Sequence, residues 1–136
     1  MAMELIDQGL ELLDEDECRR LLALSTVGRI GLSVNGLPVI FPVNYRVVGD
    51  TVVFATGPGM KLTAAHAGEV VAFEVDDVDE DGRAGWSVLV VGAASELDAP
   101  TRQLLAAMDP WAGGDRSHLV RITSDLVSGR RLLPES

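Results

Sequence analysis

The sequence predicts a mainly β fold, a barrel of about six antiparallel strands with short helices at its periphery. Hydrophobic residues alternate with period two in most of the valine-rich segments, and turns containing glycine or asparagine separate consecutive strands. The few helical segments do not alternate with strands one for one, as they would in a parallel sheet. The 136 residues suit a single domain. We expect a loosely ordered leader over residues 1–11 and one domain over residues 12–136.

The first regular element is a helix that begins after Asp14. Asp14 is the expected N-cap, and Glu17 occupies the third helical position, as in a capping box. The helix is expected to run to about Leu24. Cys18 falls on the apolar face at helical spacing, so we expect it to be a packing residue and not a reactive thiol.

A three-stranded meander follows this helix. The pair Asn35-Gly36 separates the first two strands and is typical of a type I′ hairpin, whose two central positions both need a positive φ. Gly49-Asp50 separates the second strand from the third, which is rich in β-branched residues. The three expected strands cover residues 27–34, 37–48 and 51–55.

The second half of the chain continues the barrel. Its long strand is apolar on both faces, so one face must meet the barrel interior and the other a helix or a partner subunit. The acidic run at residues 76–82 is expected to be a solvated loop, since it lacks the spacing of a calcium-binding EF-hand. The remaining elements are helices at 60–67 and 100–108, strands at 70–76, 86–97 and 118–123, and residues 126–133 as a candidate extension of the sheet.

Composition excludes several classes of function. A net charge of -10 argues against nucleic-acid binding, and no apolar segment is long enough for a membrane span, so we expect a cytoplasmic protein. The single cysteine rules out an internal disulfide, and we expect no metal site. The two histidines, His66 and His118, are expected to be structural. Hydrophobic residues make up 47% of the chain, which favours burial of apolar surface against a second copy.

One segment has the pattern of a phosphate-binding turn. Residues 54–61 pass from a strand through Gly57-Pro58-Gly59 into a helix, so backbone N–H groups, the Thr56 hydroxyl and the Lys61 ammonium are expected to converge on one anion. An ordinary turn with a surface lysine remains the alternative. Pro42 interrupts a strand and suits an edge or bulge, with a solvent-facing Tyr45 and Arg46 as the simpler interpretation.

Taken together, these segments resemble the pyridoxamine 5′-phosphate oxidase-like flavoproteins, most of all their short actinobacterial branch. The resemblance covers roughly residues 12–133. The segments that carry it are Val27-Gly28-Arg29-Ile30-Gly31, Pro38 through Pro42-Val43-Asn44-Tyr45, Phe54-x-Thr56-x-x-Gly59-x-Lys61, Val71-Ala72-Phe73-Glu74-Val75-Asp76 and Gly85-Trp86-Ser87-Val88.

The resemblance implies an FMN-binding split barrel that works as a homodimer, with the cofactor site at the subunit interface. Arg29 and Arg46 would be secondary candidates for contact with the phosphate. The ending at residues 127–132 does not reproduce the arginine–histidine pair with which the oxidase itself grips its substrate, so oxidation of pyridoxamine phosphate is not expected. The implied contacts are Pro42, Val43 and Asn44 with the isoalloxazine through backbone groups, Thr56 and Lys61 with the phosphate, and Trp86 and Ser87 with the flavin.

The function implied is an FMN-binding oxidoreductase that passes hydride or electrons through the flavin to or from a small molecule. Three alternatives stay open: an F420-dependent reductase, a non-catalytic protein that binds flavin or haem, and a dimeric barrel without a cofactor.

Overall fold

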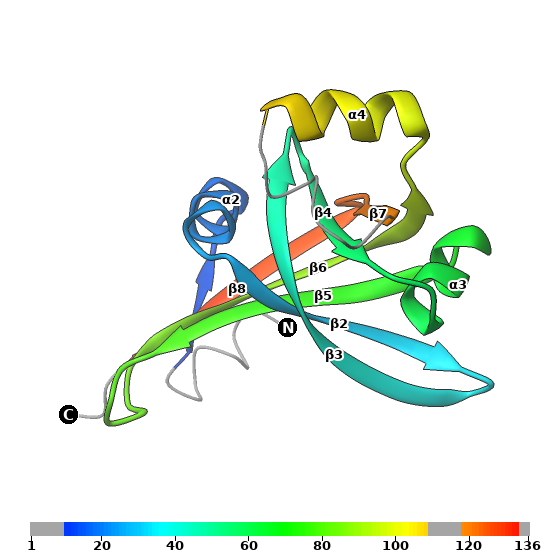
Figure 1. The fold of residues 1–136 in the computed structure, drawn as a ribbon. Coiled ribbons are helices and arrows are strands. Elements are labelled where there is room, and N and C mark those ends of the chain that lie inside the picture. Colours follow the sequence, from blue (N-terminus) through cyan, green and yellow to red (C-terminus); the bar gives the residue numbers. More distant parts are fainter. Residues whose placement is uncertain (1–9, 109–117, 134–136) are drawn as a thin grey trace.

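The structure, a computed structural model, describes residues 10–108 and 118–133. Within this part of the chain, six antiparallel strands close into a barrel, and two further strands extend one side of it (Figure 1). The strands are β1 (Leu10–Leu13), β2 (Val27–Val34), β3 (Leu37–Val48), β4 (Thr51–Thr56), β5 (Val70–Val78), β6 (Gly85–Glu96), β7 (His118–Ile122) and β8 (Leu126–Leu132), and the helices are α2 (Glu15–Leu24), α3 (Met60–His66) and α4 (Ala99–Met108).

The barrel closes in the order β6-β5-β2-β3-β4-β7, with β7 pairing back onto β6. The predicted mainly β barrel with peripheral helices is therefore confirmed. Strand β8 pairs with the part of β6 that precedes its pairing with β7, on the same edge, and β1 pairs with β8. Strand β1 differs from the sequence prediction, because it begins inside the segment expected as a leader. Its partner lies at the other end of the chain, and residues 1–9 lie outside the described part.

Local signals in the sequence are confirmed where they were strongest. Asn35 and Gly36 have φ values of 52° and 81°, as a type I′ turn requires. The Asp14 carboxylate accepts a hydrogen bond of 2.8 Å from the Glu17 backbone N–H and caps α2. Cys18 is fully buried, as expected of a packing residue.

The side chain of Glu17 connects α2 to β8. It accepts hydrogen bonds from Arg20 at 2.7 Å and from Arg131 at 3.0 Å, so it does not complete the reciprocal half of a capping box. The bonds from Arg20 and then Arg131 lower the pKa of Glu17 to about 2. Because Arg131 lies in β8, this ion pair holds the outer strands against the helix.

Tyr45 lies inside the barrel and not in solvent. Its side chain is fully buried, its hydroxyl donates a hydrogen bond to the Leu22 carbonyl, and its ring meets Phe73 edge-on, with centroids 4.8 Å apart. Burial raises the pKa of Tyr45 to about 12. The interpretation of a solvent-facing Tyr45 is wrong, because alternation along β3 places this residue on the inner face.

The two ends of β6 pair with different strands. It pairs with β8 up to Val91 and with β7 from Ala94, so it bends around the corner of the barrel near Gly92. Its inner face is buried, whereas its outer face is only half-buried within one chain. Beyond the corner, α4 covers a small second apolar cluster that includes Leu97 and Leu119. None of the helices in the described part has the length and apolar character needed to cross a bilayer.

Candidate functional site

The candidate site lies where β3 and β4 separate. Strand β3 pairs with β2 over residues 37–44 and with β4 only over residues 45–48. The β3–β4 pairing ends at Tyr45 and Phe54, so the preceding part of β3 and the end of β4 diverge. Among the described residues, no strand pairs with this edge of β3. Pro42 lies in this part of β3, which pairs with β2 on its other side, and a residue without a backbone N–H is tolerated at the unpaired edge.

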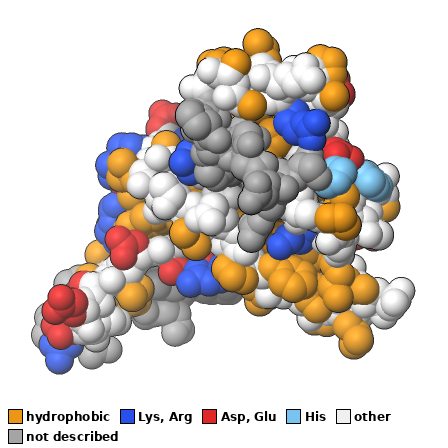
Figure 2. All heavy atoms as spheres, viewed as in Figure 1, with side chains coloured by type: hydrophobic (Ala, Val, Ile, Leu, Met, Phe, Trp, Pro, Cys, Tyr) orange, Lys and Arg blue, Asp and Glu red, His pale blue; other side chains and the backbone are white. Residues whose placement is uncertain are grey.

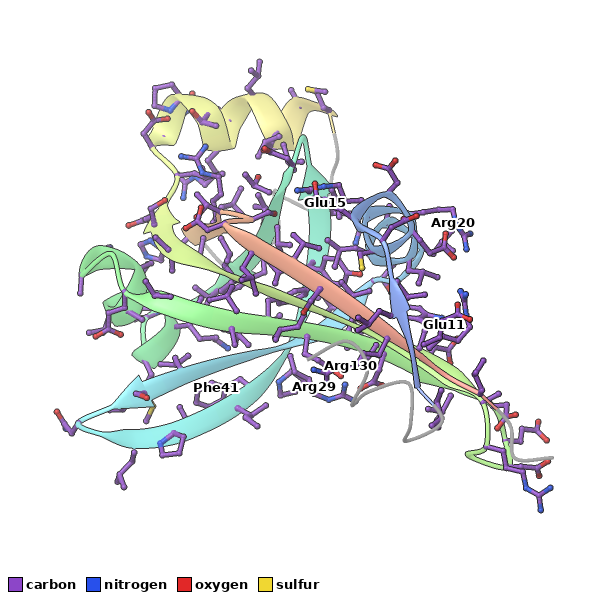
Figure 3. All side chains as sticks on the ribbon, turned by 180° about the vertical axis from the view of Figure 1, so that it is seen from behind. Glu11, Glu15, Arg20, Arg29, Phe41 and Arg130 are labelled. Atoms are coloured by element: carbon purple, nitrogen blue, oxygen red, sulfur yellow. The ribbon has the colours of Figure 1, made fainter. Side chains whose placement is uncertain are left out.

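A cavity of about 410 Å³ occupies this separation. Phe41 of β3 forms one wall, and Thr56 with the turn at residues 57–61 forms the other. The Lys61 ammonium lies 5.1 Å from the centre of the Phe41 ring, within reach of a cation–π contact. The Phe41 side chain projects from the β2–β3 hairpin (Figure 3). The structure therefore brings together Thr56 and Lys61, the two residues expected to bind phosphate.

The turn presents open backbone to this cavity. A Cβ at Gly57 or Gly59 would meet no atom within 4 Å, so a ligand can approach the main chain closely at both positions. Gly59 has a φ of 151°, a value that favours glycine. Its carbonyl accepts a bond from the Thr63 N–H, whereas the N–H groups of the first turn of α3 have no acceptor within the helix. The turn thus supplies donors and a cation, as an anion site requires.

Thr56 is placed less directly for phosphate binding. Its side chain is 5% exposed, and its hydroxyl donates to the Gly57 carbonyl at 3.1 Å. The hydroxyl would have to rotate away from this carbonyl to donate to a ligand.

Three of the other predicted residues, Pro42, Asn44 and Ser87, lie on the outer face of the sheet. Cross-strand register places Pro42 opposite Arg29, and Ser87 between Asp76 and Arg130. Pro42 and Asn44 are exposed there, and Ser87 is half-buried. Val43 is buried within the barrel, and by the alternation of the β2–β3 ladder its backbone N–H and C=O face Gly28 and not the unpaired edge.

Trp86 and Ser87 line a second cavity of about 330 Å³ together with Asp76, Val78, Arg130 and Leu132. By strand alternation the Trp86 side chain lies on the face opposite that of Ser87, where it packs against the main core. Within one chain, this cavity shares no lining residue with the cavity at Thr56 and Lys61. Figure 1 shows the β5–β6 turn and α3 at opposite ends of the barrel.

The two arginines named as secondary phosphate candidates are engaged elsewhere. Arg29 forms ion pairs with Glu74 and Asp76 on the outer face. Arg46 donates a hydrogen bond of 2.9 Å to the Tyr45 carbonyl. Neither arginine lines the cavity beside Lys61.

Sequence reasoning missed Glu96, which links the two histidines. One Glu96 oxygen lies 2.6 Å from His66 Nε2, and the other lies 2.6 Å from His118 Nδ1. His66 is in the last turn of α3, and His118 is the cross-strand neighbour of Thr56. The cluster therefore fastens α3, which carries Lys61, to the barrel. No sequence motif connects these three residues, which meet only through strand pairing.

Replacing Glu96 with glutamine is expected to lower stability at pH 7 by about 1 kcal/mol, because a charged acceptor of two hydrogen bonds is lost. The bonds to His118 and then to His66 hold the pKa of Glu96 below its usual value. A carboxyl with a lowered pKa stabilises the fold above its unfolded pKa and loses that effect as the pH falls through its folded pKa. Thermal unfolding of both proteins from pH 7 to pH 3 should therefore show the difference shrinking in acid. A difference independent of pH would contradict this role.

Across the described residues, no three histidine, cysteine, aspartate or glutamate side chains are placed to share a metal ion. In particular, Glu96 lies between the two histidines and uses both of its oxygens to contact them.

Known proteins are similar to this chain in sequence and in fold. The family model described as pyridoxamine 5′-phosphate oxidase matches residues 14–131. Uncharacterized protein Rv0080 of Mycobacterium tuberculosis is 37% identical over 131 residues, which is 91% of this chain and 86% of that protein. An FAD binding protein from Mycobacterium smegmatis superposes with a TM-score of 0.69 at 34% identity and covers 90% of this chain and 97% of its own.

A FAD-binding protein from Mesorhizobium loti gives a TM-score of 0.71 at 28% identity, covering 90% of this chain and 96% of its own. The family match spans the barrel from the N-cap of α2 into β8, and it includes every residue named at the two cavities except Leu132. The chain belongs to the pyridoxamine 5′-phosphate oxidase family.

Proposed function

We propose that this protein binds a flavin nucleotide, with the phosphate group in the cavity between β3 and β4. The observation that carries the proposal is the meeting of Lys61, open glycine backbone and helix N–H groups at the point where the two strands diverge. The unpaired edge of β3 beside this cavity offers the Pro42 carbonyl and the backbone groups of Asn44 to the flavin ring. FMN is the nucleotide we expected from the sequence.

The related proteins support the broader class of ligand. Those from M. smegmatis and M. loti are named for FAD, which contains the same flavin and ribityl phosphate as FMN with an added nucleotide. The cavity at Lys61 opens to the surface, so it suits either a terminal phosphate or the first phosphate of a longer group. The proposal therefore covers FMN and FAD.

The proposed activity is oxidoreduction of a small molecule, for which a bound flavin supplies hydride or electron transfer. The protein would contribute position, shielding and charge. Lys61 would hold the phosphate, and the β3 edge would orient the ring. A cytoplasmic location is part of this proposal.

We also propose that the working unit is a homodimer. Hydrophobic side chains gather over the β2–β3 hairpin (Figure 2), where Leu37 is 69% exposed and Ile40 is 70% exposed. Contiguous apolar surface of this kind is typical of an interface. A second copy on this face would allow the Trp86–Ser87 cavity of one chain to face the Lys61 cavity of the other, which a single chain keeps apart.

The test is a titration of the cofactor-free protein with FMN, FAD, F420 and haem, followed by flavin fluorescence, absorbance and thermal unfolding. We expect saturable binding of FMN or FAD and a stabilisation of about 2.7 kcal/mol when the flavin is at a hundred times its Kd. Stabilisation by F420 or haem alone would reassign the cofactor, and no effect of any ligand would contradict the proposal. Flavin reduction by NAD(P)H with turnover would distinguish an enzyme from a flavin carrier.

A further inference from the structure

Two carboxylates and one arginine form a compact group on the outer face of the sheet. Arg29 Nη1 donates to Glu74 Oε1 at 3.1 Å and to Asp76 Oδ2 at 3.2 Å. Glu74 and Asp76 are two residues apart in β5, so their side chains lie next to each other on one face. A single guanidinium compensates only one of the two negative charges. One carboxyl therefore gains from keeping its proton.

The neighbours of Glu74 indicate that Glu74, and not Asp76, is the carboxyl that keeps its proton. Strand β2 contributes Arg29 and β5 contributes Asp76, whereas β6 places the uncharged Leu89 directly opposite. In β8, Arg130 lies opposite Ser87, and Figure 3 shows it projecting from the same region of the sheet as Arg29. Burial first, and then the contact with Asp76, raise the pKa of Glu74 to about 7 despite the opposing effect of Arg29.

This group adjoins the residues proposed to contact the flavin. Asp76 lies directly opposite Ser87 and lines the same cavity, and Arg29 lies directly opposite Pro42. Directly opposed side chains in an antiparallel sheet have Cβ atoms about 4.5–5.5 Å apart. A flat ring that contacts Ser87 therefore covers or touches the Asp76 carboxyl, whichever of two subunits provides the rest of its site.

We propose that Glu74 is the proton-exchanging residue of the flavin site, and that its ionised fraction takes up a proton from solvent when a flavin ring binds over the outer face at Ser87. The inference rests on the proposed function. The ring displaces water from the Glu74–Asp76 pair, which penalises the doubly ionised state. The proton joins a Glu74 oxygen as an O–H that can donate to Asp76, and Arg29 continues to compensate the remaining charge. No bond to the flavin forms or breaks.

The sign of the pH dependence follows from this arrangement. Glu74 is about half protonated near pH 7 in the free protein, and the bound flavin raises its pKa further. The affinity for flavin should be constant at pH values below the pKa of Glu74 in the free protein. It should fall by up to about tenfold per pH unit between that pKa and the higher pKa of Glu74 in the complex. Binding should therefore be tighter at pH 6 than at pH 8.5.

The experiment is isothermal titration calorimetry of flavin binding at pH 7.5 in two buffers with different heats of ionisation. FAD is the main probe, since the monoester phosphate of FMN itself titrates near pH 6. FMN is the second probe, and its phosphate contributes equally to each variant. We expect the wild type to take up a fraction of a proton and Glu74→Gln to take up less, with an affinity that varies less with pH. Glu80→Gln, the same change at an exposed residue of the β5–β6 loop, should match the wild type.

Flavin binding with equal proton uptake in the wild type and in Glu74→Gln would overturn the role of Glu74 and leave the flavin proposal intact. No binding to the wild type at any pH would overturn the proposed function, and this inference with it. If Glu74→Gln fails to fold, carboxyl-carbon NMR of the wild type decides the matter. The Glu74 resonance should titrate at higher pH with flavin than without it, and an unchanged midpoint would overturn the inference.

Discussion

Replacing Lys61 with alanine is expected to weaken flavin nucleotide binding by about 10- to 150-fold while the barrel stays folded. A charge-assisted hydrogen bond to phosphate contributes about 1.5–3 kcal/mol, which corresponds to this range of Kd. The Lys61 side chain is half-buried at the mouth of the cavity, and its ammonium contacts the Phe41 ring outside the fully buried core. Loss of its ammonium should therefore affect the ligand far more than the fold.

The measurement is a flavin titration of the variant beside two controls. Arg83→Ala removes one positive charge from the exposed β5–β6 loop and tests for a general electrostatic effect. Lys61→Arg retains the charge and should keep most of the affinity. An unchanged Kd for Lys61→Ala would remove this residue from the site.

The composition of the chain allows a second test of the same contact. Lys61 is the only lysine, so an amine-selective reagent can modify only this side chain and the N-terminal amine. We expect saturating flavin to slow modification of Lys61 and to leave the N-terminus unaffected. Equal rates with and without flavin would contradict phosphate binding at Lys61.

Replacing Gly92 with alanine is expected to destabilise the protein by about 3 kcal/mol, the upper part of the usual range for overpacking. A Cβ at this position would lie 1.7 Å from the Thr123 carbonyl oxygen and 2.6 Å from its carbon, both atoms of the backbone. Backbone cannot yield as a flexible side chain can, so β6 and the segment after β7 would have to separate. That separation would open the barrel at the corner where it closes.

Chemical denaturation of the variant should show this loss of stability, with Gly31→Ala as the matched control. A Cβ at Gly31 would meet its nearest neighbour, the Ala72 Cβ, at an ordinary 3.8 Å. Both changes add one methyl group to a glycine in a barrel strand, and only Gly92 should be intolerant. Similar stabilities for the two variants would contradict this account of the corner.

The sequence was informative wherever a structural choice depends on neighbouring residues. The cap at Asp14 and the turn at Asn35 and Gly36 follow from side-chain and backbone preferences within a few residues, and both were predicted correctly. Period-two alternation likewise predicted a strand at residues 27–34, in which alternate residues are buried. The turn at residues 57–61 could be identified as a candidate anion site because its glycines, helix start and lysine are contiguous.

Contacts between distant segments could not be obtained in this way. Glu96 joins His66 and His118 from three separate elements, and Arg29 meets Glu74 across a strand pair whose register no local pattern specifies. Tyr45 was misplaced in solvent because the polar residues beside it suggested an exposed edge. The burial of its ring depends on Phe73, which is 28 residues farther along the chain.

The sequence by itself determined the class of the fold, the positions of most strands and the turn that carries Lys61, because period-two alternation, capping and turn chemistry act over a few residues. The tertiary structure decided the pairing of β1 with β8, the change of partner along β6 and the divergence of β3 from β4 that opens the cavity. These features arise from backbone hydrogen bonds between segments far apart in the chain. Their free energy depends on barrel closure as a whole, so no local window contains it.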